Sequence, residues 1–239
     1  MTDTSDAPVQ NPHQNVSFGS GDASAHGYLA VPASGSGPGL VVIQEWWGLT
    51  EHIKDVTDRF AAEGFVALAP DLFGGPTTHD SDEAGQLMQD LPVERAARDL
   101  SGAVDFLLGH DAVTSSTVGA VGFCMGGGFV LVMAAQQGDR VGAAVPFYGV
   151  GGYDQVDLGG VTAPVLGHFG SEDGFAPPAQ VDALEAELQA KSQGSVEIVR
   201  YPGAGHAFFN DENPMGTYDA ELAAQAWART LEFVRANVR

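Results

Sequence analysis

Short apolar runs alternate with longer amphipathic stretches along most of the chain. Leu40-Val41-Val42-Ile43 is the clearest run, and an apolar run without polar alternation is typical of a strand buried on both faces of a parallel sheet. The pattern predicts strands at residues 27–31, 40–43, 65–68, 118–122, 143–147, 165–169 and 196–201. The stretches between them favour helices at residues 52–63, 93–108, 125–136, 178–191 and 220–236, the last with apolar residues every three to four positions.

This alternation of strands and helices predicts a three-layer α/β fold, with a mostly parallel central sheet and helices on both faces. Residues 15–239 are expected to form one domain. Residues 1–14 are polar and without periodicity, which predicts a flexible tail, and residues 33–38 and 74–83 are predicted loops. Active sites in such sheets gather at the carboxyl ends of the strands, so candidate residues are sought there.

Charge narrows the classes of partner. The 239 residues include 31 acidic and 10 basic side chains, for a net charge of −21. Such a field repels phosphate backbones and anionic lipids, so neither a nucleic acid nor a membrane surface is an expected partner. The start of the chain lacks the basic and apolar stretches of a signal peptide, and no apolar run reaches the roughly 18 residues of a membrane helix. We therefore expect a cytoplasmic protein, monomeric or homodimeric, that acts on a small molecule.

The segment Gly122-Phe123-Cys124-Met125-Gly126 follows a predicted strand and opens a predicted helix. A nucleophile on a sharp strand-to-helix turn needs small flanking residues, and the helix N-terminus favours its thiolate. The alternative is a buried cysteine packed between glycines. Cys124 is the single cysteine, which excludes an intrachain disulfide and zinc clusters of several cysteines. Residues 126–128 are all glycine, but no Lys-Ser/Thr follows, so they predict no phosphate site, and we expect neither a cofactor nor a metal.

A nucleophile at this turn predicts an acid and then a histidine on later strand ends. Asp173 follows the strand at 165–169, and His206 follows the strand at 196–201. Asp173 could instead cap a helix or stabilise a turn, and Glu172 is a weaker rival for the acid. His168 falls inside its strand and is predicted to be a packed residue.

Five segments of the chain carry a family signature. They are Gln44-Glu45-Trp46-Trp47-Gly48, Pro70-Asp71-Leu72-Phe73, Gly122-Phe123-Cys124-Met125-Gly126-Gly127, Asp173, and Gly205-His206-Ala207-Phe208. With these motifs the chain resembles the dienelactone hydrolase family, a branch of the α/β-hydrolases. The resemblance extends from about residue 16 to residue 238. The resemblance implies that Cys124, Asp173 and His206 form a catalytic triad and that Glu45 contacts the resting thiol. It further implies an oxyanion hole made by the backbone amides of Trp46 and Met125.

The chain departs from the family where the substrate carboxylate is held. Dienelactone hydrolases use arginines after the Pro-Asp-Leu-aromatic segment and after the catalytic histidine, and Gly75 and Asn210 stand at those positions here. Neither can pair with an anion. The predicted enzyme is therefore a cysteine-dependent hydrolase of carboxylic esters or lactones, working through a thioester and not specific for the anionic dienelactone.

Several alternatives to this interpretation stay open. The thiol could react with peroxide in a redox protein, although the chain has no second cysteine to resolve the oxidised form, or an inactive hydrolase fold could bind a ligand. Glu45 could be a solvated loop carboxylate. Trp46 and Trp47 could wall an aromatic acyl pocket or could simply pack. Residues 79–83 resemble a metal site in composition only and are predicted to be a solvated loop.

Overall fold

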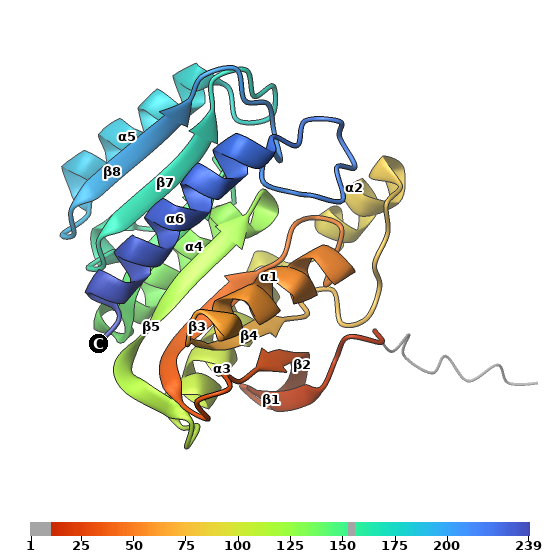
Figure 1. Ribbon diagram of the computed structural model, residues 1–239, viewed down its shortest axis with the longest axis vertical. Coiled ribbons are helices and arrows are strands. Elements are labelled where there is room, and N and C mark those ends of the chain that lie inside the picture. The colour runs from red at the N-terminus through yellow and green to blue at the C-terminus, as the bar shows by residue number, and fades with distance from the viewer. Residues whose placement is uncertain (1–10, 153–155) are drawn as a thin grey trace, which may run out of the picture.

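One eight-stranded sheet organises the chain (Figure 1). The computed structural model describes residues 11–152 and 156–239. The strand order is β1-β2-β4-β3-β5-β6-β7-β8; β1 and β2 pair antiparallel with each other, β2 pairs antiparallel with β4, and all other neighbours are parallel. The strands are β1 (Val16–Ser20), β2 (Ala23–Ala30), β3 (Gly37–Ile43), β4 (Val66–Pro70), β5 (Val113–Phe123), β6 (Val141–Phe147), β7 (Val165–Gly170) and β8 (Val196–Tyr201).

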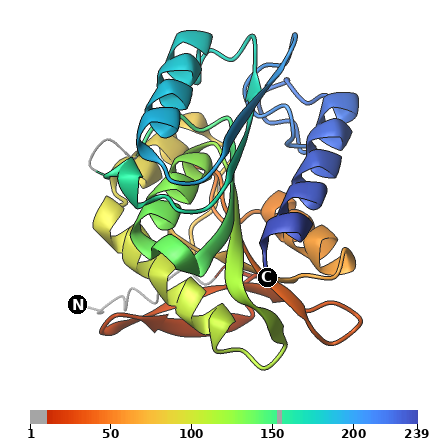
Figure 2. The ribbon, with the colours of Figure 1, turned by 90° about the vertical axis from the view of Figure 1, so that its left-hand side faces the viewer.

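Helices cover both faces of the sheet, as Figure 2 shows with the sheet seen nearly edge-on. One face is covered by α1 and α6, and the other by α3, α4 and α5. The helices are α1 (Glu51–Ala62), α2 (Ser81–Gln89), α3 (Val93–Leu108), α4 (Met125–Gln137), α5 (Pro178–Lys191) and α6 (Ala220–Asn237). This is the predicted three-layer α/β architecture. No helix in the described part of the chain is long and apolar enough to cross a membrane.

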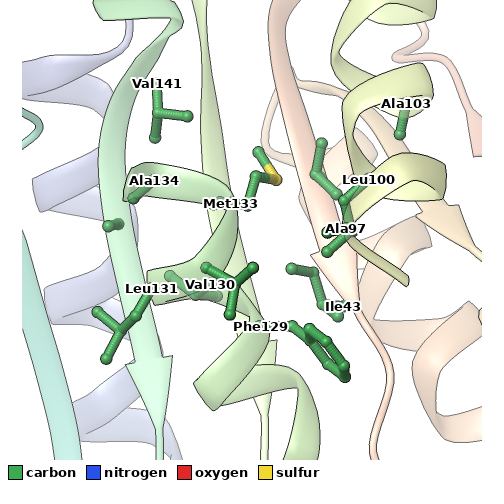
Figure 3. Close-up of a cluster of buried hydrophobic side chains, with 14 of the residues drawn as sticks. Ile43, Ala97, Leu100, Ala103, Phe129, Val130, Leu131, Met133, Ala134 and Val141 are labelled. Carbon is green, nitrogen blue, oxygen red and sulfur yellow. The ribbon is translucent and has the colours of Figure 1, made fainter. Parts of the chain in front are cut away.

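Helix α4 lies at the centre of one hydrophobic core (Figure 3). Its residues 126–134 are all buried, and a helix that is apolar on every side is stable only when it is enclosed on every side. Phe129, Val130 and Met133 pack in a cluster with Ile43 of β3 and Leu100 of α3. The enclosure fixes α4, and with it the residue that precedes the helix.

The five predicted helices are confirmed, two of them with the predicted bounds. The strand β1 was not predicted because it is short and half of it is solvent-exposed, and β5 begins five residues earlier than expected with a stretch of alternating exposure. The predicted loop at residues 74–83 is wrong at its end, because α2 begins at Ser81. Asp80 caps it by accepting hydrogen bonds from the amides of Asp82 and Glu83, so residues 81–83 form the first turn of a helix and only residues 79 and 80 belong to the loop.

The expected tail of residues 1–14 lies outside the described residues up to residue 10. Of the remaining four, Asn11 is buried and donates a side-chain hydrogen bond to the Leu49 carbonyl oxygen, and Gln14 donates one to the Asp71 carboxylate. The packed part of the chain therefore begins earlier than the predicted boundary at residue 15.

His168 is a packed strand residue, as predicted. Its two ring nitrogens lie within hydrogen-bond distance of the Tyr201 hydroxyl (2.9 Å) and the Thr230 hydroxyl (3.1 Å). Burial, with a small contribution from the charge of Arg229, lowers the pKa of the His168 imidazole to about 3. The side chain therefore stays neutral and joins β7, β8 and α6.

This burial predicts a pH dependence of stability. An unfolded imidazole with a pKa near 6.5 binds a proton that buried His168 rejects until about pH 3, so the free energy of unfolding should fall as the pH drops through this range. The slope of that free energy against pH should be smaller in His168→Gln, by up to about 1.4 kcal/mol per pH unit. Urea unfolding between pH 7 and pH 4.5 measures the slope. The exposed His26→Gln is the control, and equal slopes for wild type and His168→Gln would contradict the assignment.

Candidate active site

Cys124 lies on a strained turn between β5 and α4. Its backbone has a φ of 53°, in the left-handed region that non-glycine residues rarely adopt. The turn leaves no room for neighbouring side chains: a Cβ on Gly122 would lie 2.3 Å from the Gly126 carbonyl oxygen, and a Cβ on Gly126 would lie 2.5 Å from the carbonyl oxygens of Ile43 and Gln44. Glycine is therefore required on both sides of Cys124, as the sequence motif indicated.

The next two glycines let α4 approach β6 and the chain beyond it. A Cβ on Gly127 would lie 2.7 Å from the Phe147 carbonyl oxygen, and one on Gly128 would lie 1.8 Å from the Gly151 carbonyl oxygen. The three glycines thus serve close packing of a helix against backbone, which explains their run without any phosphate-binding role.

Glu45 and Cys124 follow two neighbouring strands, at the place where the chain order of the sheet reverses. From β3 the chain passes to β4 on one side and then returns to β5 on the other, and ligands of open α/β sheets bind at such a point. Ile43, at the end of β3, is paired in register with Gly122 of β5. The residues that follow these two strands therefore lie side by side at the same edge.

Asp173 is held by hydrogen bonds to both of its carboxylate oxygens. Oδ1 accepts from the backbone amides of Phe175 and Ala176, each at 2.8 Å, and Oδ2 lies 2.8 Å from Nδ1 of His206. The predicted turn role is confirmed by Oδ1, whereas Oδ2 contacts the histidine, as the predicted acid would. Glu172, the rival acid, is exposed to solvent.

His206 presents its two nitrogens to different surroundings. Nδ1 contacts Asp173, whereas Nε2 is buried and makes no hydrogen bond to any residue that the structure describes. Burial lowers the pKa of the imidazole, but the Asp173 carboxylate and the neighbouring Cys124 raise it more, to about 10. Cys124 and His206 line the same cavity, so Nε2 is the nitrogen available to the thiol.

Glu45 is a buried carboxylate with defined partners. It is 1% exposed, which contradicts the interpretation as a solvated loop residue. Oε1 accepts a hydrogen bond from the Tyr148 hydroxyl at 3.1 Å, and Oε2 accepts one from Nδ2 of Asn210 at 2.6 Å. Asn210 stands at one of the two positions where the sequence comparison with dienelactone hydrolases expects an arginine. Its side-chain amide is engaged by the Glu45 carboxylate.

Tyr148 is a site residue that the sequence analysis missed. It directly follows β6 and has a φ of 39°, the second strained non-glycine residue at this edge of the sheet. Burial, together with the charge of Glu45, raises the pKa of its hydroxyl well above the ordinary value, so the group stays protonated and donates to Glu45. Its position after a buried strand was the available signal, because Glu45 and Cys124 occupy the same place after β3 and β5.

The two predicted oxyanion-hole amides lie at the ends of the same strands. The amides of Trp46 and Met125 make no hydrogen bond to another residue in the described ranges. The rings of the two tryptophans have different surroundings: Trp47 is buried and stacks on His79, whereas Trp46 is half-buried, with its ring centroid 6.3 Å from that of Phe175. Trp47 is thus a packing residue, and Trp46 borders the site through Phe175.

A cavity of about 420 Å³ opens onto the thiol and the imidazole. Among the described residues that line it there is no Lys, Arg, Asp or Glu, and its polar side chains are Cys124, Tyr148, Gln180 and His206. The apolar lining comes from α2, α3, α4 and the segments after β6 and β7, through Met88, Leu91, Val93, Met125, Phe129, Val150 and Phe175.

Comparison with known proteins shows which family the chain resembles. Residues 25–238 match the family model described as the dienelactone hydrolase family. A protein of Aquifex aeolicus assigned as a carboxymethylenebutenolidase is 30% identical, with 95% of this chain and 99% of that protein covered. A protein of Bradyrhizobium assigned as a 2-oxo-3-(5-oxofuran-2-ylidene)propanoate lactonase is 31% identical, with 92% of each chain covered. The crystal structure of a protein of Klebsiella pneumoniae assigned as a dienelactone hydrolase superposes with a TM-score of 0.80 at 30% identity, covering 96% of this chain and 97% of that one.

The geometry of the turn predicts the effect of one added methyl group. Gly126→Ala should lower the free energy of unfolding by about 1–3 kcal/mol, because the methyl meets two fixed carbonyl oxygens and no side chain can move aside. Gly85→Ala in α2 is the control, since its Cβ would meet nothing within 4 Å. This substitution should raise the free energy of unfolding by up to about 1 kcal/mol. Urea unfolding measures both variants. Equal stability of the two would show that the turn has room.

Proposed function

The chain belongs to the dienelactone hydrolase family and is a hydrolase of carboxylic esters or lactones; we propose that it works through a Cys124–His206–Asp173 triad and a thioester intermediate, on uncharged substrates. The observation that carries the proposal is the pair of environments around His206. Asp173 holds Nδ1, and the unpartnered Nε2 is left in the cavity that Cys124 lines. This is the arrangement of a base that is oriented by an acid and serves a nucleophile.

The proposed reaction has two halves. The Cys124 thiol gives its proton to Nε2 of His206, and the resulting thiolate attacks the ester or lactone carbonyl carbon. The carbonyl oxygen becomes an oxyanion that accepts hydrogen bonds from the Trp46 and Met125 amides. Each such donor lowers the barrier by roughly 3 kcal/mol in comparable sites. The C–O bond then breaks, His206 gives its Nε2 proton to the leaving alkoxide, and a thioester remains. Water gives a proton to His206 and attacks the thioester carbonyl carbon. The C–S bond then breaks, the acid is released, and the Cys124 thiolate takes the proton back from His206.

Three observations support an uncharged substrate. The Asn210 side chain donates to Glu45 and is not free to hold a substrate carboxylate. Gly75 has no side chain to offer, and the described lining of the cavity contains no Lys or Arg. With a net charge of −21, the protein also does not concentrate anions at its surface. The family chemistry is retained in this proposal without the recognition of a carboxylate.

In this proposal Glu45 lowers the reactivity of the resting Cys124 thiol. A buried carboxylate next to the turn opposes a second negative charge on sulfur, whereas the helix N-terminus and protonated His206 favour it. Tyr148 and Asn210 hold the carboxylate at a fixed place through two hydrogen bonds. The resting nucleophile is thus kept less reactive until a substrate occupies the cavity.

Replacement of the nucleophile tests the central claim. We expect Cys124→Ala to lower kcat/KM for a neutral ester by about a thousandfold or more, with the thermal midpoint within a few degrees of wild type, because the side chain lies on a turn at a cavity. Rapid quenching of wild type with a substrate should give an intact mass increased by the acyl group. Retained turnover in Cys124→Ala would assign the nucleophile to another residue, and peroxide consumption without ester turnover would favour the redox alternative.

The two partners of the thiol should contribute unequally. His206→Ala should lose more rate than Asp173→Asn, since the histidine moves the proton and the acid orients and stabilises it. In Asp173→Asn the remaining oxygen can still accept from the turn amides, so the free energy of unfolding should change less than in Asp173→Ala. Steady-state rates with urea unfolding separate the two roles. Glu172→Gln is the control, and a larger rate loss there than in Asp173→Asn would reassign the acid.

The proposed effect of Glu45 predicts that its replacement changes the reactivity of the Cys124 thiol. In Glu45→Gln the loss of the carboxylate charge should make a thiolate at Cys124 more favourable, so alkylation by iodoacetamide near neutral pH should become faster. Turnover need not rise, because a more stable thiolate is a weaker nucleophile. With a single cysteine in the chain, intact mass reports the site directly. If the alkylation rates of wild type and Glu45→Gln depend on pH in the same way, Glu45 does not lower the reactivity of the thiol. A Glu45→Gln profile shifted to higher pH would mean that Glu45 helps to form the thiolate.

A further inference from the structure

We propose that the substrate carries an extended apolar group, an alkyl chain or an aromatic ring, and that this group binds against a wall formed by Met88, Leu91 and Val93, here called the α2–α3 wall. The inference rests on the proposed function, because the wall belongs to the cavity that Cys124 and His206 line. The α2–α3 wall takes no part in the proposed reaction steps at Cys124 and His206.

The cavity gathers the large apolar side chains that the protein leaves in contact with water. Five such residues are exposed in the described part of the chain, and three of them line this one cavity: Met88 (42% exposed), Val93 (37%) and Phe175 (58%). Scattered exposed apolar residues need no explanation, but convergence at the mouth of a cavity marks a binding surface. A ligand that covers all three would remove their apolar surface from water.

The exposure of Met88 is not a by-product of core packing. Ala84 is the one buried residue of α2, and the helix is fixed at its start by the Asp80 cap and by the Thr78 hydroxyl, which donates to the Glu83 carboxylate. The far end of α2 therefore presents Met88 at the cavity without using it to hold the helix. A flexible thioether of this kind adapts to apolar groups of different shapes.

Part of the cavity lining consists of glycines. Gly149, Gly151 and Gly152 line the cavity with backbone alone, and a Cβ added to Gly151 would meet no atom of the described residues within 4 Å. Apart from His206, whose charge serves Cys124 in the proposed reaction, the described lining offers no charged group that would compensate for burying a substrate charge, and an unpaired buried charge is strongly unfavourable. Space, apolar walls and missing charge together favour an uncharged apolar group over a short polar one.

A series of 4-nitrophenyl esters tests the wall. From acetate to butyrate to hexanoate, kcat/KM should rise by about two- to fourfold for each methylene that becomes buried, and Cys124→Ala should abolish turnover of every member. Values that stay flat or fall beyond acetate would overturn the inference while leaving the Cys124 reaction intact. No Cys124-dependent turnover of any member would instead overturn the proposed function.

A matched pair of esters tests the charge preference at the wall. The 4-nitrophenyl pentanoate and the 4-nitrophenyl monoester of glutarate have five-carbon acyl chains and differ by a terminal carboxylate. Wild type should prefer the pentanoate at least tenfold. Met88→Arg should reduce this preference by about tenfold, because a guanidinium at the wall pairs with the carboxylate. Val31→Arg, at an equally exposed apolar residue outside the catalytic cavity (43%), is the control for the change in net charge, and an equal effect in both variants would overturn the inference.

A steric variant provides a measurement that does not depend on charge. Gly151→Leu adds a bulky side chain to a residue that lines the cavity and has free space among the described residues, so the ratio of kcat/KM for hexanoate to that for acetate should fall towards one. Circular dichroism and the thermal midpoint establish that the variant is folded. An unchanged ratio in the folded variant would show that the acyl group lies elsewhere and would overturn the assignment.

Discussion

The close approach of α4 to the carboxyl ends of β3 and β6 is the constraint on which the rest of the site depends. It is possible because Gly126, Gly127 and Gly128 present no side chain to the backbone that they touch. It is kept in place because the following residues of the helix are buried on every side. Cys124 takes up the strain of the turn with a φ of 53°. Packing in the core thereby fixes a thiol at the surface of a cavity.

Buried charge at this edge of the sheet is organised by hydrogen bonds. Asp173 holds both its own loop and the His206 ring, so that the turn and the position of the imidazole depend on one carboxylate. Glu45 is held by two neutral donors, Tyr148 and Asn210. A buried carboxylate is strongly unfavourable without such partners. The proposed balance between thiol and thiolate follows from the fixed places of these charges around one sulfur.

The same contacts account for the proposed change of substrate within the family. An amide at position 210 satisfies Glu45 without adding a positive charge to the site. With Gly75 at the second position, no side chain of the arginine type reaches a substrate carboxylate from either place. The cavity that remains is apolar over most of its described lining. The proposed chemistry at Cys124 and the proposed recognition of the substrate thus depend on separate features of the fold, so one can be kept while the other changes.

The sequence by itself determined the layered α/β architecture and the five long helices, and it picked out the residues of the proposed triad. Continuous apolar runs, helical periodicity and the glycines around Cys124 are local patterns, and each follows from the physical requirements of the element that contains it. It did not predict β1 or α2, because β1 is half-exposed and α2 buries Ala84 alone, so neither has a strong periodic pattern. Only the tertiary structure decided that Tyr148 and Asn210 hold Glu45 and that Met88 and Val93 reach the cavity. These residues are far apart in the sequence, and which of them meet depends on the order of the strands and on the distances between packed elements.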